Sequence, residues 1–160
     1  MRPLFVTLAL TLTLVFGCSR SGDSDNYVHV ADDDKEMEAA IARAVATTND
    51  FMTAFRAQKP GMKNFCLKKP YPTPEGSSEH MWIEITAEGD GVFKGTVANK
   101  AEETTKVKLG QEVFVRLDEI SDWKYEDGKK LVGGYTIRYF LNKMSAEERK
   151  KVLEQSGFEL

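Results

Sequence analysis

The sequence has few of the residues that enzymes most often use for catalysis. Its 160 residues include two histidines and two cysteines, and His29 and Cys18 precede the segment that we expect to fold. The spacings that mark zinc sites, phosphate-binding loops, dinucleotide-binding loops and serine nucleophiles are all missing. Metal binding through the remaining His80 and Cys66 would need several carboxylate ligands as well. The sequence therefore predicts no cofactor and no metal site, and it favours a binding function while leaving enzymatic activity open.

The chain also lacks the excess of positive charge that is typical of nucleic-acid-binding proteins. Its 22 basic and 25 acidic side chains give a formal net charge of −3 at pH 7. Removal of residues 1–17 would take away Arg2 and no acidic residue, which leaves 21 basic and 25 acidic side chains. We therefore expect no nucleic-acid partner and no attachment to anionic lipid through net charge.

A single long apolar run, Leu4–Phe16, lies near the N-terminus after Arg2. It has the length of a signal peptide and is too short to span a bilayer comfortably. Gly17 and Cys18 follow it, as in a bacterial lipobox, where the cysteine thiol is acylated and becomes the new N-terminus. Phe16 departs from the lipobox pattern, which usually has a small residue there, and an ordinary secretory signal is the alternative. We predict a lipoprotein with diacylglycerol and palmitate-type acyl chains on Cys18.

The segment after Cys18 is small and polar, as a tether between lipid and domain should be. We predict a signal peptide at residues 1–17, a tether at 18–31 and a single domain at 32–160. The predicted location is the cell envelope, on the periplasmic side of a membrane. Ser19 after the cysteine resembles the sorting pattern that favours the outer membrane over the inner membrane.

Hydrophobic periodicity predicts an α+β domain with a long N-terminal helix and a short C-terminal helix. Between them we expect a bent antiparallel sheet or half-open small barrel of five to six strands. The C-terminal helix has a capping box at Ser145 and Glu148 and a C-cap at Gly157. The expected elements are a helix at 32–58, strands at 64–69, 80–87, 92–98 and 111–117, a hairpin at 120–141 and a helix at 145–155.

The hairpin at 120–141 is the densest aromatic and β-branched stretch of the chain. We predict a turn at Glu126–Lys129 and a second strand at Leu131–Leu141. This places Gly133 and Gly134 inside a strand, where they would not form a phosphate-binding loop.

Several aromatic residues fall on strand faces that should be polar. Trp82 and Phe114 lie opposite the apolar face of their own strands. One interpretation is an exposed binding surface, and the other is that a helix covers this face and the rings are packed inside. Arg138 is expected either to lie at an edge or to pair with a carboxylate. The predicted binding surface consists of Trp82, Asp122, Trp123, Tyr135 and Arg138.

Asp122-Trp123, Gly128 and the run Leu131–Arg138 (LVGGYTIR) resemble the YegJ-type family, domain of unknown function 2314. Pieces upstream agree with it, including MWIE at 81–84 and GTVAN at 95–99. The resemblance covers most of residues 32–141. It implies a bacterial domain without assigned catalytic residues, some members of which are lipoproteins.

Three functions are consistent with these features. The first is a lipid-anchored module that binds another envelope protein through the predicted surface. The second is a hydrolase acting on envelope material through His80, Cys66 or Glu84. The third is a sensor with a small ligand inside the barrel. The sequence predicts no oligomeric state.

Overall fold

The computed structural model describes residues 34–160, which form an α+β domain with a six-stranded antiparallel sheet that is not closed. The predicted fold class is confirmed. Residues 1–33, with the predicted signal peptide and Cys18, lie outside the described part. The strands are arranged in the order β4-β3-β2-β1-β5-β6. Their bounds are Met62–Pro72 (β1), Ser78–Gly89 (β2), Val92–Val97 (β3), Glu112–Arg116 (β4), Asp122–Asp127 (β5) and Lys130–Gly133 (β6).

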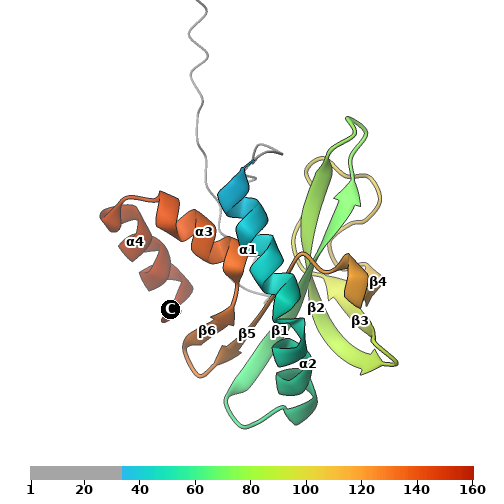
Figure 1. Cartoon of the computed structure of the whole chain (residues 1–160), viewed down its shortest axis with the longest axis horizontal. Helices are drawn as coiled ribbons and strands as arrows, with labels where there is room; N and C mark the ends of the chain where they lie inside the picture. Colours follow the sequence, from blue (N-terminus) through green and yellow to red (C-terminus); the bar gives the residue numbers. More distant parts are fainter. Residues whose placement is uncertain (1–33) are drawn as a thin grey trace, which may run out of the picture.

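Two consecutive helices pack on one face of the sheet (Figure 1). They are α1 (Lys35–Ala46), which Asp34 caps, and α2 (Thr48–Ala57). The sequence predicted one continuous helix, but the chain leaves helical geometry at Thr47, whose hydroxyl donates to Arg43 O at 2.8 Å. This face holds the larger core, in which Phe51 contacts the rings of Phe55, Phe65, Phe93 and Trp123.

The second strand of the predicted hairpin is much shorter than expected. Strand β6 ends at Gly133, and residues 135–143 form helix α3 (Tyr135–Lys143). Gly133 and Gly134 have φ values of +73° and +64°, a conformation that glycine adopts without strain. A Cβ on Gly133 would lie 2.4 Å from Trp123 O, so only glycine fits. The prediction of a strand up to Leu141 was wrong, and the two glycines lie between a strand and a helix.

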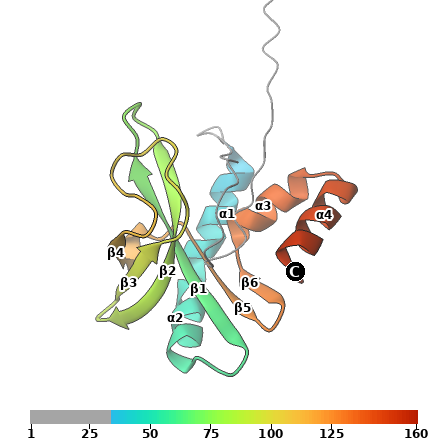
Figure 2. The ribbon, with the colours of Figure 1, turned by 180° about the vertical axis from the view of Figure 1, so that it is seen from behind.

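Helix α3 and helix α4 (Ala146–Ser156) lie beside the β5–β6 hairpin (Figures 1 and 2). The predicted capping box of α4 is confirmed, and Gly157 ends the helix at φ +71°. Side chains from β6, from α3 and from the segment after α4 pack with Cys66 and Trp82. Cys66 and Trp82 lie on the face of the sheet opposite to α1 and α2. This second core consists of Cys66, Trp82, Leu131, Ile137, Leu141 and Phe158. Among residues 34–160, no helix has the length and apolar character needed to cross a membrane.

Candidate functional site on the second face of the sheet

The second face of the sheet buries charged residues beside its small apolar core. Lys68 of β1 pairs in register with Trp82 of β2 on one side and with Asp122 of β5 on the other. Lys124 lies two residues farther along β5, opposite Cys66. Buried charges are costly unless they are paired or have a function, so this row is our candidate site. We refer to Lys68, Trp82, Asp122 and Lys124 as the lysine cluster.

Asp122 is fully buried, and its carboxylate binds the N-terminus of α3. One oxygen accepts from Trp123 N at 2.8 Å and from Tyr135 N at 3.2 Å. The other accepts from Thr136 N at 2.8 Å and from the Thr136 hydroxyl at 2.6 Å. A carboxylate in this place satisfies free N–H groups and interacts favourably with the helix dipole. The anion-binding end of α3 is therefore already occupied by the protein itself.

Lys68 is connected to Asp122 through one hydroxyl group. Its ammonium donates to Thr136 Oγ1 at 3.2 Å and lies 5.2 Å from the centre of the Trp82 ring. Burial lowers the pKa of Lys68, and the charge of Asp122 opposes this effect. Burial likewise raises the pKa of Asp122, while Lys68 and the bonds from Thr136 lower it. Each group thus favours the charged form of the other.

Lys124 is the most unusual member of the cluster. Only 3% of it is exposed, yet within residues 34–160 its ammonium has neither a hydrogen-bond acceptor nor an ion pair. Its contacts are with rings, 5.0 Å from the centre of Trp82 and 5.9 Å from that of Phe158. Burial lowers the pKa of Lys124 to about 8. The Lys124 ammonium can donate three hydrogen bonds to an anion, and its neutral form can act as an amine near neutral pH.

His80 lies at the edge of the same face, two residues before Trp82. Its Nδ1 is 2.8 Å from Ser121 Oγ, and the Ser121 hydroxyl donates to Lys68 O at 3.1 Å. Because the hydroxyl has a single proton, we assign the imidazole proton to Nδ1. Burial and the nearby Lys68 charge lower the pKa of His80 to about 4. The imidazole is therefore neutral at physiological pH.

His80 should make stability depend on pH between about 6.5 and 4. In this range the unfolded chain binds a proton on His80 that the native state excludes, so stability falls as pH falls. Allowing for partial exposure, we expect a loss of about 2 kcal/mol in the free energy of unfolding. Urea unfolding at several pH values, compared with His80→Asn, measures it. His80→Asn should not show this loss of stability between about pH 6.5 and 4, whereas a matched His29→Asn variant should still show it. Equal pH dependence in wild type and His80→Asn would contradict the assignment.

The structure does not place the five predicted surface residues on one exposed surface. Trp82 is 7% exposed and Trp123 is 2% exposed, and they lie on opposite faces of the sheet. Asp122 is buried beside Lys68, and Tyr135 packs against the larger core with its hydroxyl 3.0 Å from Thr47 Oγ1. The interpretation that these rings serve packing is the one that the structure supports.

Among residues 34–160, Arg138 has no carboxylate partner, so the ion pair that was one of its two expected arrangements is not formed there. Its guanidinium donates to Gly133 O at 2.9 Å and to Leu131 O at 2.7 Å. These bonds connect α3 to the end of β6 and satisfy carbonyl groups that the sheet leaves unpaired. Arg138 is thus a structural residue of the strand–helix junction.

The three residues of the predicted hydrolase site are only partly brought together. Cys66 and Glu84 are register partners on the second face, but Cys66 is fully buried. His80 precedes Glu84 by four strand positions, or about 13 Å, with Trp82 between them. Within residues 34–160 there is also no group of three or more residues that could hold a metal ion. The predicted ligand site inside the barrel is filled by side chains from α1 and α2.

The sequence prediction missed Lys68 and Thr136, and it placed Lys124 only at the rim of the predicted binding surface. A usable signal was present for Lys68, because alternation places it on the same face as Cys66 and opposite Leu67. Lys124 alternates with Trp123 in the same way. What the pattern alone did not provide was the cover over this face, since the residues of α3 were assigned to a strand.

Two comparisons with known proteins place the chain in a family. Residues 34–160 match the family described as "Uncharacterized protein conserved in bacteria (DUF2314)". The chain is 33% identical over 143 residues to "Uncharacterized protein YegJ" of Escherichia coli (strain K12), which covers 89% of this chain and 92% of YegJ. No solved structure matches.

A second relative is similar over a shorter stretch. The chain is 39% identical over 72 residues to "Putative ankyrin repeat protein NMB1133/NMB1171" of Neisseria meningitidis serogroup B (strain ATCC BAA-335 / MC58). This match covers 44% of the chain and only 28% of that protein. The matches to the family and to YegJ span most of the sequence, and the chain therefore belongs to the bacterial DUF2314 family of uncharacterized proteins.

Proposed function

We propose that this chain is a lipid-anchored envelope protein whose domain binds another envelope protein at the β3–β4 end of its sheet. The observation that supports this site is the exposure of Phe114, of which 60% is accessible although it lies in a strand. Val92 and Leu117 are exposed at 37% and 40%. Large exposed apolar side chains that gather in one place are typical of protein-binding surfaces.

The three apolar residues are neighbours in the structure. Val92 pairs with Arg116, so it is the diagonal neighbour of Phe114 on the same face. A Cβ added to Gly91 would lie 3.4 Å from Leu117 Cδ1, which places Leu117 beside Gly91, the residue that precedes Val92. We call Val92, Phe114 and Leu117 the β4 patch.

The β4 patch lies at the outer strand of the sheet, where a partner has access. At the other outer strand, the C-terminal segment pairs with β6 through Leu131 N to Glu159 O and Glu159 N to Lys129 O, both at 2.8 Å. On β4, Phe114 O accepts from Lys69 Nζ at 3.3 Å and Arg116 N donates to Glu119 at 2.9 Å. The Phe114 carbonyl and the Arg116 N–H are therefore already hydrogen-bonded to side chains, and an added strand would need both groups for pairing. The partner therefore binds through side-chain contacts.

The anchor is Cys18, which lies outside the described residues. The lipobox-like sequence supports acylation there, and Asp34 follows 16 positions later. A fully extended segment of this length reaches about 50 Å. The domain can thus contact proteins on the periplasmic side of its membrane, for which Ser19 favours the outer membrane.

Affinity capture after crosslinking in the host envelope tests both parts of the proposal. We expect a partner protein to be recovered with full-length wild type and lost with Phe114→Ser, because the change removes the centre of the β4 patch. Val45→Ser is the matched control, since Val45 is an exposed apolar residue on α1. The recovered protein is then tested for direct binding to purified chain. Undiminished binding to Phe114→Ser would rule out the β4 patch.

Mass spectrometry of the purified chain tests the anchor separately. We expect the peptide that begins at Cys18 to carry acyl chains, and Cys18→Ser to lose both the lipid and partner capture. The sequence has only two cysteines. A disulfide between Cys18 and Cys66 in the non-reduced digest would contradict acylation, because the Cys18 sulfur cannot be bonded to the lipid and to Cys66 at the same time.

A further inference from the structure

Positive charge is concentrated in the last part of the chain. Residues 129–160 contain seven basic and four acidic side chains, whereas residues 34–128 contain 13 basic and 17 acidic ones. The chain as a whole is negatively charged, but its C-terminal region has a net positive charge. This region is α3, α4 and the residues that flank them, which lie together beside the β5–β6 hairpin (Figure 2).

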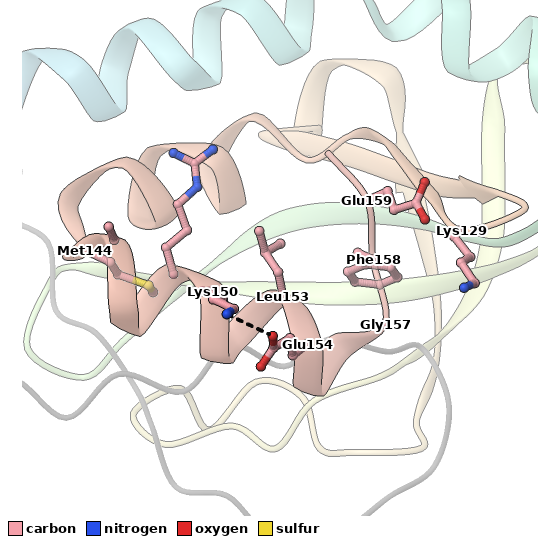
Figure 3. A pocket seen from close by; sticks show the side chains of 10 residues that line it. Lys129, Met144, Lys150, Leu153, Glu154, Gly157, Phe158 and Glu159 are labelled. Atoms are coloured by element: carbon pink, nitrogen blue, oxygen red, sulfur yellow. Dashed lines mark ion pairs between the residues drawn. The ribbon is translucent and has the colours of Figure 1, made fainter.

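A pocket of about 640 Å³ lies between α4 and the β5–β6 turn (Figure 3). Its apolar wall comes from Met144, Leu153 and Phe158, and Figure 3 shows the Phe158 ring beside Leu153. Its basic residues are Lys129, Arg149 and Lys150. A volume of this size accommodates a small organic molecule.

Two of the three basic residues are available to a ligand. Lys150 lies 3.8 Å from Glu154, also in the pocket wall. Lys129 and Arg149 have no ion pair within residues 34–160, and Arg149 Nη1 donates a hydrogen bond to Asn142 Oδ1 at 3.5 Å. Glu159 is the second acidic residue of the wall, and its backbone is fixed by pairing with β6.

The buried charge of Lys124 lies close to one wall of the pocket. The Phe158 ring that forms part of this wall lies 5.9 Å from the Lys124 ammonium. This ammonium is almost completely buried and has no acceptor for its protons within the described residues. A buried cation without an acceptor is destabilising, and a negative charge in the pocket would offset part of this cost although Lys124 does not line the pocket.

We propose that this pocket binds an anionic amphiphile, with its apolar chain on Met144, Leu153 and Phe158 and its acidic head group toward Lys129 and Arg149. Fatty acids and anionic phospholipids share this chemistry. The site is distinct from the β4 patch, and it does not depend on acylation of Cys18.

Photolabelling of the full-length chain in a neutral detergent tests the proposal. The probes are decanoic acid, decanol and decylamine, each with the same diazirine near the end of its chain. We expect the acid to label the segment 144–159 at least tenfold more than the amine, because only the acid offers acceptors to the lysine and the arginine. A photoreactive phosphatidylglycerol in vesicles distinguishes a membrane lipid from a free fatty acid as the source.

Three variants connect the labelling to the site. The double variant Lys129→Met/Arg149→Met should reduce labelling by the acid at least fivefold, and Leu153→Trp should do the same by filling the pocket. Lys63→Met, which changes an exposed lysine of β1, should leave labelling unchanged. Circular dichroism confirms that each variant is folded. Equal labelling by acid and amine, or full labelling of both the double variant and Leu153→Trp, would overturn the proposal.

Discussion

Replacement of Asp122 with asparagine is expected to lower the free energy of unfolding by about 3–5 kcal/mol. The carboxylate accepts four hydrogen bonds from Trp123, Tyr135 and Thr136, three of them from the first two residues of α3. An asparagine would turn an NH₂ group toward two of these donors. It would also leave the charge of Lys68 without a nearby opposite charge.

Urea unfolding followed by circular dichroism measures this change. The matched control is Asp118→Asn, because Asp118 is exposed and pairs with Arg116 at the surface. Exposed ion pairs contribute between about 0 and 1 kcal/mol, so this variant should unfold almost like wild type. If Asp122→Asn is as stable as Asp118→Asn, then Asp122 does not hold α3 against the sheet.

The same carboxylate explains why the sequence predicted a strand where the chain forms α3. The run Tyr135–Leu141 is rich in aromatic and β-branched residues, which favour strands when considered alone. Its helix start has no local capping residue, because Gly134 stands at the N-cap and offers no side chain. The capping group is Asp122, which precedes Thr136 by 14 positions. A long-range cap leaves no signal in the local sequence.

Elements with local signals were predicted well. The capping box at Ser145 and Glu148 starts α4, and the turn at 88–91 joins β2 to β3. Gly95 lies inside a strand, where a glycine is typical of a bulge or a close approach of the backbone. The register does shift near it, and a Cβ there would lie 2.3 Å from Glu84 O. In each case the residues that determine the structure are close together in the chain.

The candidate site was harder to predict, because its members become neighbours only through strand pairing. Alternation correctly separated Trp82 from Met81 and Ile83, but it could not show what covers the face that carries Trp82. The cover comes from α3 and from Phe158 after α4. Because the residues of α3 were assigned to a strand, the sequence left open whether the rings on the second face form an exposed surface or pack under a cover.

Replacement of Lys124 with methionine is expected to raise the free energy of unfolding by about 3 kcal/mol at pH 7. Methionine fills a similar volume and avoids burying an ammonium that has no acceptor within residues 34–160. The pKa of Lys124 falls from 10.5 in the unfolded chain to about 8 in the native state. Below pH 8 the native protein bears the full unfavourable free energy of the buried charge.

The pH dependence of this gain identifies its cause. Between pH 8 and 10.5 the native lysine is neutral while the unfolded one is still protonated, so wild-type stability rises with pH. The advantage of Lys124→Met should therefore shrink over this interval and vanish near pH 10.5, as measured by urea unfolding of both proteins. Lys63→Met, at an exposed position, should show no such trend. A destabilised Lys124→Met would show that the ring contacts with Trp82 and Phe158 stabilise the ammonium.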